Sequence, residues 1–428
     1  MSMKFRLIIM NFLQFAVWGA YLTSMGSYLV SLNQASHIGM FYAIQGVVSM
    51  FMPALIGIVA DRWVPAQKLY SLCHGIAGIF MVAAGYYGYI AGTGVEYSIL
   101  FTLYTVSVAF YMPTLALSNS VAYSVLDKAG LDTIKAFPPI RIFGTIGFIC
   151  AMLFVDITGY QHTYAQFFTS GILGLILAIY AITCLPNIEI VRSSGTKKSF
   201  AESLGLDAFK LFKKRKMAIF FIFSMLLGIS LQITNGFANP FITSFKAIPE
   251  FANSFGANHA NALISISQIS ETVCILLIPF FLRKFGIKKV MLIAMVAWVL
   301  RFGLFGAGDP GPNVWMFILS MIVYGVAFDF FNISGSLFVD KETTTSIRSS
   351  AQGLFMLMTN GVGATIGTLG AQAVVSHFTY SIEHNGSYYT VGDWSSVWYI
   401  FAGYALVVAI LFAFIFKYKH EPETVPGK

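Results

Sequence analysis

The sequence predicts an all-α integral membrane protein with twelve transmembrane helices. Of its 428 residues, 57% are hydrophobic and only 10% are charged, whereas about 25% are charged in an ordinary soluble domain. Apolar runs of about 20 residues, the length needed to cross the hydrocarbon core of a bilayer, recur along the whole chain. Helices are predicted rather than a β-barrel because these runs are continuously apolar and do not alternate with polar residues.

The predicted helices follow one another with short polar connections. The first run is too long for the core of a signal peptide and ends without a small-residue cleavage site, so we expect it to remain as a helix. The twelve ranges, in order, are 7–31, 38–60, 69–92, 97–125, 138–160, 163–185, 217–244, 258–282, 288–308, 313–338, 347–376 and 394–417.

The longest polar stretch lies between the sixth and seventh predicted helices. Its second part, residues 201–216, combines leucines and phenylalanines with lysines, a pattern typical of an amphipathic helix on a membrane surface. We therefore expect an N-terminal six-helix bundle at residues 1–186, a cytoplasmic linker with an amphipathic segment at 187–216, and a C-terminal six-helix bundle at 217–428.

The Lys and Arg residues predict the orientation, because they are concentrated on the cytoplasmic side of membrane proteins. All but three of the 26 basic residues fall in loops on one side of the twelve predicted helices. Arg141 and Arg301 lie within helices, and Lys246 lies in a loop on the opposite side. Both termini are therefore expected in the cytoplasm, and this bias explains most of the net charge of +8 without a nucleic-acid partner.

The cysteines and histidines predict neither disulfide bonds nor a metal site. Cys73, Cys150, Cys184 and Cys274 all lie in hydrophobic runs without CxxC or Cys/His spacing, so we expect small core residues. His74 is the one histidine well inside a predicted helix, and no ligand partner lies three or four residues away. No cofactor is expected, and no nucleophile constellation indicates an enzyme.

Glu271 is the most informative single residue, because it lies deep in the apolar run ISISQISETVCILLIP at residues 264–279. A charge at the centre of a membrane helix costs roughly 2.5–3.5 kcal/mol on insertion scales, so such residues are usually functional. Asp329 is a second acid inside a predicted helix. For Asp329, the sequence is equally compatible with a salt bridge to Arg301 or Arg141 and with a role in proton coupling.

Other polar and aromatic residues share helix faces, because positions three or four apart project together. In lipid, such groups must face the protein interior or a water-filled cavity. Four helices from both halves are therefore predicted to form one polar site. The same-face groups are Gln268 with Glu271, Gln232 with Asn235, Arg141 with Thr145 and Phe148, and Tyr324 with Phe328.

The side chains of this predicted site indicate a small, polar, uncharged and partly flat ligand. Amides offer donors and acceptors to mixed hydrogen-bonding edges, and aromatic rings can hold a planar body. A carboxylate can accept hydrogen bonds from hydroxyl groups. Structural roles remain open: amides often join membrane helices, aromatic rings often face lipid, and Arg141 could extend to the cytoplasmic interface.

Weak internal similarity indicates a duplicated chain, as in many transporters. The paired segments are PALIGIVADRW (53–63) with PFFLRKFGIKK (279–289), and LDK (126–128) with VDK (339–341). The first loop resembles, in degenerate form, the GxxxD[RK]xGx[RK][RK] motif of the major facilitator superfamily through Gly57, Asp61 and Arg62. This resemblance implies the major facilitator fold of two pseudo-symmetric six-helix bundles.

Longer segments resemble a more specific family, the bacterial proton-coupled nucleoside permeases of the NupG type. These segments include FPPIRIFGTIGF (137–148), LFKKRKMAIFFIFSMLLG (211–228), LQITN (231–235), SQISET (267–272) and MIVYGVAFDFFNISGS (321–336). The resemblance covers nearly the whole chain. It implies a nucleoside:H⁺ symporter of the bacterial cytoplasmic (inner) membrane that works by alternating access as a monomer in the lipid bilayer.

The resemblance also implies a set of site residues. The positions matching the family's nucleoside contacts are Gln232, Asn235, Gln268 and Glu271, completed by Arg141, Thr145, Phe148, Tyr324 and Phe328. The family's acidic residue on the tenth helix matches Asp329, so Glu271 and Asp329 are the candidates for proton coupling. Ile229 and Ser230 occupy a variable patch that bears on base preference. An alternative is a proton-coupled sugar or oligosaccharide carrier of the same fold.

Overall fold

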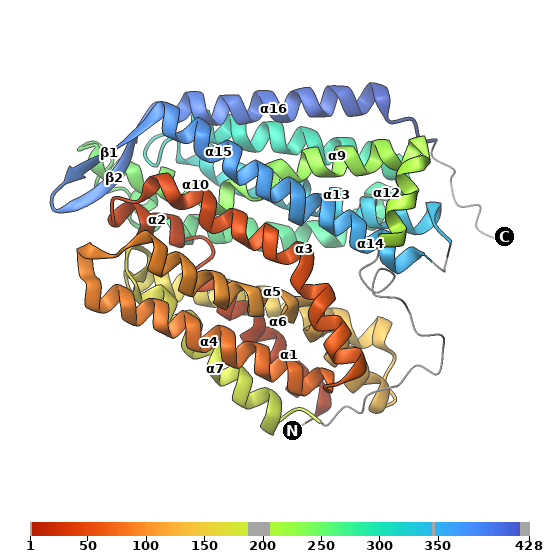
Figure 1. Cartoon of the computed structure of the whole chain (residues 1–428). Coiled ribbons are helices and arrows are strands. Elements are labelled where there is room, and N and C mark those ends of the chain that lie inside the picture. Colours follow the sequence, from red (N-terminus) through yellow and green to blue (C-terminus); the bar gives the residue numbers. More distant parts are fainter. Residues whose placement is uncertain (1, 187–205, 345–346, 420–428) are drawn as a thin grey trace.

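The structure, a computed structural model, describes residues 2–186, 206–344 and 347–419, and consists mainly of helices that run side by side (Figure 1). The helices in the first part of the chain are α1 (Met3–Gly19), α2 (Met25–Ser31), α3 (Ile38–Arg62), α4 (Ala66–Ala91), α5 (Tyr97–Lys128), α6 (Thr133–Ile157) and α7 (Ala165–Thr183). Those in the second part are α9 (Arg215–Leu231), α10 (Ile233–Ser244), α11 (Phe255–Asn258), α12 (Ala260–Ala307), α13 (Val314–Glu342), α14 (Arg348–Met356), α15 (Ala364–Phe378) and α16 (Trp394–Ile415).

Helix occupies every range predicted from the sequence, so the prediction of a helical membrane protein is confirmed. Within the described residues, ten helical stretches are long and apolar enough to cross a membrane. The number is lower than twelve for two reasons. The first predicted helix is interrupted between α1 and α2, and α12 joins the eighth and ninth predicted helices across Gly286. At Gly286 φ is 75°, a conformation that glycine adopts at no steric cost.

Two more of the predicted membrane helices are interrupted. The seventh divides at Gln232 into α9 and α10, and the eleventh divides into α14 and α15 around a π-helical turn at Leu357–Gly363. Such irregular turns in membrane helices are tolerated where protein or water satisfies the freed backbone groups. They are also frequent at functional sites.

A short β-hairpin interrupts the helical pattern between α15 and α16. Strands β1 (Thr379–His384) and β2 (Ser387–Gly392) pair in antiparallel register. The connecting residues Asn385 and Gly386 both have positive φ, 51° and 75°, as the tight Asn-Gly turn of a hairpin requires. The predicted helix ranges left this segment as a loop, although its Asn-Gly pair is a recognised hairpin signal.

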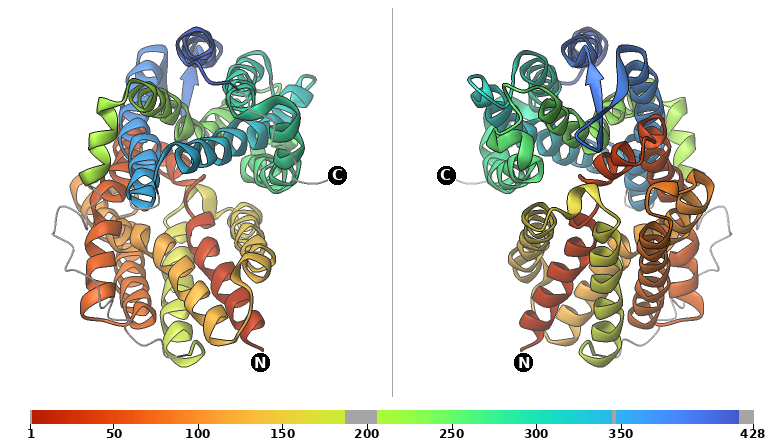
Figure 2. Two further views of the ribbon diagram at one scale, coloured as in Figure 1. Left: turned by 90° about the vertical axis from the view of Figure 1, so that its right-hand side faces the viewer. Right: turned by 90° about the vertical axis from the view of Figure 1, so that its left-hand side faces the viewer.

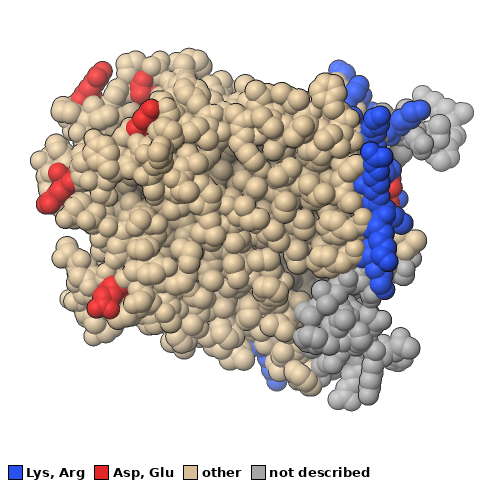
Figure 3. All heavy atoms as spheres, turned by 45° about the horizontal axis from the view of Figure 1, so that its top comes forward, with Lys and Arg blue, Asp and Glu red and all other residues tan. Residues whose placement is uncertain are grey.

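The helices gather into two groups, with α1 to α7 on one side and α9 to α16 on the other (Figure 2). Contacts across the two groups include α3 with α15, where the Gly39 amide donates to the Gln372 side chain at 2.7 Å. On the face shown in Figure 3, Lys and Arg gather at one end of the molecule, and most of the visible Asp and Glu lie at the other. We call these the basic end and the outer end, the second name following the orientation expected from the sequence.

The predicted linker is described only in part. Residues 187–205 lie outside the described residues, and Leu206–Lys213 form a 3₁₀ helix in place of the expected amphipathic α-helix. Ala208 and Leu211 are buried in it, whereas Phe209 and Lys210 are exposed. The described part of the segment is therefore two-sided, but it is short and tightly wound.

Candidate functional site

The site is organised around a close crossing of α12 and α13. A Cβ atom at Gly325 would lie 2.6 Å from the backbone carbonyl of Ser270, so only glycine allows this approach of the two helices. The Ser270 hydroxyl also donates to the carbonyl of Ile322. Because Glu271 follows Ser270, and Tyr324 precedes Gly325, the crossing brings the predicted carboxylate next to the predicted aromatic residues.

The two aromatic residues on α13 form a stacked pair. The rings of Tyr324 and Phe328 are 5.6 Å apart between centroids and 18° from parallel. This geometry is an offset stack, and it confirms the prediction that these residues share one helix face. Tyr324 is buried and Phe328 is partly exposed, so the pair presents part of one ring to its surroundings.

Gln232 and Asn235 also lie together, as predicted. The Asn235 amide nitrogen donates to the Gln232 side-chain oxygen at 2.7 Å. The sequence predicted them on one continuous helix, whereas Gln232 lies at the interruption between α9 and α10. Both side chains are partly exposed, and the remaining Gln232 N–H groups stay available to a ligand.

Arg141 on α6 points into the molecule and does not extend toward the basic end. Its guanidinium lies over the Phe15 ring, 3.9 Å from the centroid. A Cβ atom at Gly144 would lie 2.7 Å from Arg141 Nη1. The side chain therefore extends along α6 toward Gly144 and away from the start of the helix. The alternative of a side chain that extends toward the start of α6 is therefore not the one seen in the structure.

Phe148 lies further along α6 and meets a residue that the sequence did not indicate. Its ring makes an edge-to-face contact with Trp18 on α1 at 6.3 Å. Trp18 and Phe15 are three residues apart on α1 and so share a face, which is the only local signal that could have identified them. Thr145, between Arg141 and Phe148, is partly exposed on the same helix.

Glu271, Asp329 and Arg141 form one electrostatic cluster. Arg141 attracts both carboxylates, which repel each other. In the described part of the chain, none of the three makes an ion pair within 4.0 Å. Asp329 Oδ2 is buried without a hydrogen-bond partner there. The predicted alternative of a direct Asp329 salt bridge to Arg301 or Arg141 is therefore absent from the described residues.

The site residues come from α6, from the α9–α10 interruption, from α12 and from α13. Seven of the nine predicted ligand contacts remain partly exposed: Arg141, Thr145, Gln232, Asn235, Gln268, Glu271 and Phe328. Phe148 and Tyr324 are 6% exposed. Gln268 is positioned one turn before Glu271 on the same helix, and its backbone carbonyl accepts from the Thr272 hydroxyl at 3.2 Å. The structure thus pairs the amides of Gln232 and Asn235 and, separately, the rings of Tyr324 and Phe328.

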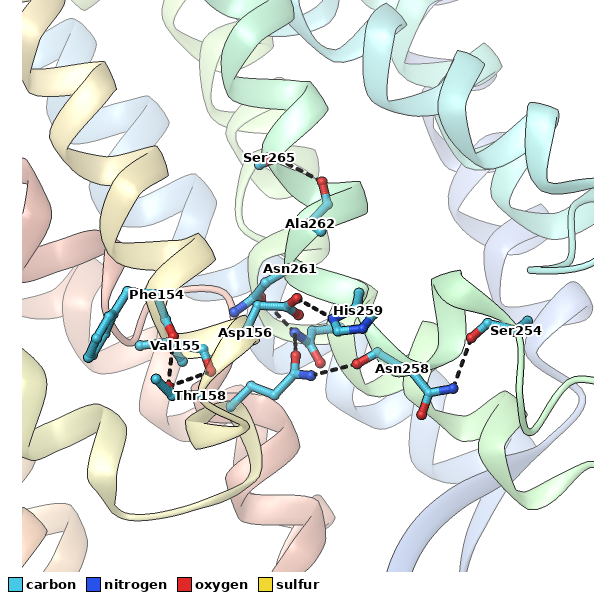
Figure 4. A network of polar contacts seen from close by, with 12 residues as sticks. Phe154, Val155, Asp156, Thr158, Ser254, Asn258, His259, Asn261, Ala262 and Ser265 are labelled. Atoms are coloured by element: carbon cyan, nitrogen blue, oxygen red, sulfur yellow. Dashed lines mark hydrogen bonds and ion pairs between the residues drawn. The ribbon is translucent and has the colours of Figure 1, made fainter.

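A second polar cluster joins the two helix groups at the outer end (Figure 4). Asp156 at the end of α6 accepts a hydrogen bond at Oδ2 from His259 Nδ1 at 2.7 Å. Gln161 donates a hydrogen bond to the carbonyl of Asn258 at 3.1 Å. Thr23 donates to the Asn261 side-chain oxygen at 3.0 Å. We call this cluster the outer latch, and its members are Thr23, Ser27, Asp156, Gln161, Asn239, Asn258, His259 and Asn261.

Comparison with known proteins agrees with this geometry. The model of the family described as nucleoside H⁺ symporter matches residues 1–421. The xanthosine permease of Escherichia coli (strain K12) is 47% identical over 99% of this chain and 98% of its own length. The nucleoside permease NupG of the same organism is 48% identical over 98% of this chain and 97% of its own.

Solved structures agree with the fold. A crystal structure of the nucleoside transporter NupG has a TM-score of 0.87 at 48% identity, covering 98% of this chain and 100% of that chain. An auto-inhibited peptide transporter of the POT family, at 15% identity, has a TM-score of 0.69 over 99% of both chains and supports the major facilitator fold alone. The chain is therefore a multi-pass membrane protein that belongs to the nucleoside H⁺ symporter family.

Proposed function

We propose that this protein carries nucleosides together with protons into the cell across the cytoplasmic (inner) membrane. The observation that carries the proposal is the α12–α13 crossing, which places the Glu271 carboxylate beside the stacked rings of Tyr324 and Phe328, and the paired amides of Gln232 and Asn235 support it. Family membership supports it, as do the names of the relatives, which are permeases for xanthosine and for nucleosides. The protein functions as a monomer in the lipid bilayer.

We propose that the two halves at residues 1–186 and 217–428 move relative to each other as six-helix bundles. The grouping of helices in Figure 2 supports this division. The basic end in Figure 3 is then the cytoplasmic end, with both termini there, because Lys and Arg are retained on the cytoplasmic side.

The proposed ligand contacts follow from side-chain chemistry. The base lies on the Tyr324–Phe328 pair, and the amides of Gln232, Asn235 and Gln268 read its polar edges. Glu271 accepts hydrogen bonds from ribose hydroxyl groups, and the residues of α6 close the other side. The partner set is thus a nucleoside and a proton, recognised without a cofactor.

Proton coupling is assigned to the carboxylates that share Arg141. With both acids charged, one guanidinium faces two negative groups in a membrane interior, which is unfavourable. Protonating one acid leaves a balanced pair, so a proton taken up from the outside favours the state that binds nucleoside. The membrane potential adds about 2.3 kcal/mol per charge per 100 mV, enough to concentrate a neutral solute roughly 50-fold.

The outer latch indicates which side is open in this state. Latch residues such as Asp156, Asn239 and Asn261 are at most 4% exposed, whereas most site residues keep solvent contact. We infer that this contact comes from the basic end and that the state is inward-facing, ready to release its cargo to the cytoplasm.

Uptake of labelled nucleosides into proteoliposomes, with and without an imposed pH gradient, tests the proposal. We expect accumulation of uridine or adenosine only when the gradient drives protons inward, with the nucleoside recovered chemically unchanged. Stronger competition by ribose or lactose than by uridine or adenosine would favour the sugar carrier instead.

A further inference from the structure

Arg301 is a buried charge that the proposed transport cycle does not use. It lies on the second half of α12 and is 2% exposed. In the described residues, no carboxylate forms an ion pair with it. Burying an unpaired charge within a membrane is expensive, so its retention indicates a function supplied by its other contacts.

Two hydrogen bonds hold the guanidinium in one place. Arg301 Nη1 donates to the carbonyl of Ser320 on α13 at 2.8 Å and to the Ser267 hydroxyl at 3.4 Å. The Ser320 hydroxyl returns a hydrogen bond to the Arg301 carbonyl at 2.9 Å. The guanidinium thus joins α13 to both parts of α12. One of its acceptors, Ser267, directly precedes Gln268 in the sequence.

The fixed guanidinium lies against the ring of Tyr324. The distance from its central carbon to the ring centroid is 4.4 Å, well within the range of a cation–π interaction. Trp298 meets the same ring edge-on at 6.0 Å and 88°. Tyr324 is therefore held by Arg301 and Trp298, while it stacks on Phe328.

Arg301 is separate from the proton-coupling cluster. In the described residues, Arg301 makes no ion pair with Glu271 or Asp329, whereas Arg141 attracts both acids. The Arg301 guanidinium lies over two rings, 4.4 Å from the centroid of Tyr324 and 5.3 Å from that of Phe305. A change at Arg301 should therefore act on the aromatic surface and leave the acids unaffected.

We propose that Arg301 is a positioning residue for base recognition, which fixes the plane of the Tyr324 ring so that the Tyr324–Phe328 pair receives the planar base of a nucleoside. This inference rests on the proposed function. A ring already held in its binding orientation loses little entropy when the ligand stacks on it. A mobile ring would lower affinity without changing the chemistry of coupling.

The first test measures nucleoside uptake by the purified full-length protein in proteoliposomes. For Arg301→Gln we expect the KM for uridine and adenosine to rise about tenfold, the effect of roughly 1.4 kcal/mol. The maximal rate per folded carrier and the pH at half-maximal uptake should stay unchanged. Arg301→Lys, which keeps a cation near the ring, should raise KM less. Arg283→Gln, an exposed charge on α12, is the matched control and should change neither value.

The second test is a double-mutant cycle with Tyr324→Leu, because interacting residues show non-additive effects. In the Tyr324→Leu background, Arg301→Gln should change KM less than twofold. A further tenfold rise there would overturn the proposal, as would a lower rate at unchanged KM in Arg301→Gln alone. If Arg301→Gln does not fold, the same cycle with Arg301→Lys decides the question.

The outcomes also separate this inference from the proposed function. A wild-type protein that takes up no nucleoside would overturn both. Wild-type uptake with an unchanged KM in the Arg301 variants would overturn only the role of Arg301.

Discussion

The carboxylates of Glu271 and Asp329 share one positive neighbour, Arg141, but their surroundings differ. Glu271 is partly exposed beside the aromatic pair, whereas Asp329 is 5% exposed and has one oxygen without a described partner. A carboxylate that reaches a ligand suits substrate binding, and a secluded one suits a proton that must not leak. From this difference we expect Glu271 to contact the nucleoside and Asp329 to carry the proton.

We expect Glu271→Gln to raise the KM for nucleosides roughly 10- to 100-fold, because a hydrogen bond to a charged acceptor contributes about 1.5–3 kcal/mol. Asp329→Asn should leave KM within a few-fold but abolish accumulation driven by a pH gradient. Transport assays in proteoliposomes measure both values, and Glu96→Gln, an exposed acid at the start of α5, serves as control. The roles are reversed if Glu271→Gln loses accumulation and Asp329→Asn keeps it.

We expect His162, in the connection between α6 and α7, to make the stability of the protein depend on pH. Burial lowers the pKa of this imidazole to about 3, and the nearby Lys246 charge contributes in the same direction. Between an ordinary pKa of about 6.5 and 3, the unfolded chain binds a proton that the folded protein does not. Stability should therefore fall as the pH drops below about 6.5.

Thermal unfolding of the purified protein at pH 7.5 and pH 5 checks this expectation. His162→Gln should reduce the loss of Tm between the two values, because the group that titrates is removed. His377→Gln, at the exposed end of α15, is the matched control. An equal loss of Tm in His162→Gln and wild type would show that other groups cause the pH dependence.

At the level of elements, local spacing predicted more than long-range arrangement did. The pairs Gln232–Asn235 and Tyr324–Phe328 were predictable because residues three or four apart on a helix meet whatever the tertiary fold. The interruption at Gln232 was not, since neither Pro nor Gly marks it within LQIT. The outer latch and the contact of Phe15 with Arg141 join segments far apart in the chain, which a single sequence does not pair.

The crossing of α12 and α13 gives a prediction about packing. Gly325→Ala should separate the two helices, because the new Cβ would lie 2.6 Å from the Ser270 backbone. Overpacking of this kind typically costs about 1–3 kcal/mol. We expect a lower Tm in thermal unfolding and weaker nucleoside binding, since Glu271 and Tyr324 flank the crossing.

Gly403→Ala on α16 is the matched control, because a Cβ atom added at Gly403 would meet no other atom within 4 Å. The same added methyl group should there leave Tm and binding unchanged or slightly improved. Equal losses in both variants would mean that the close crossing of α12 and α13 does not explain the effect.

For the whole molecule, we expect the outer latch to contribute to the balance between closed and open states. The contact of Asp156 with His259 joins α6 to the start of α12, and the neighbouring amide bonds add to it (Figure 4). Their combined strength must be limited, because a carrier has to break them in every cycle. A two-state balance of a few kcal/mol responds strongly to the loss of one such contact.

We expect Asp156→Ala to open the outer end. Losing one charge-assisted hydrogen bond of about 1.5–3 kcal/mol should raise the outward-open population at least tenfold. Glu96 and Glu250 are both exposed and belong to different helix groups. Spin labels at these two positions should report the opening as a longer distance between the labels in pulsed electron paramagnetic resonance. Thr158→Ala removes a hydroxyl that bonds only within α6 and should not lengthen it. An unchanged distance in Asp156→Ala would place the closing force in the helix contacts, such as α3 with α15, and not in the latch.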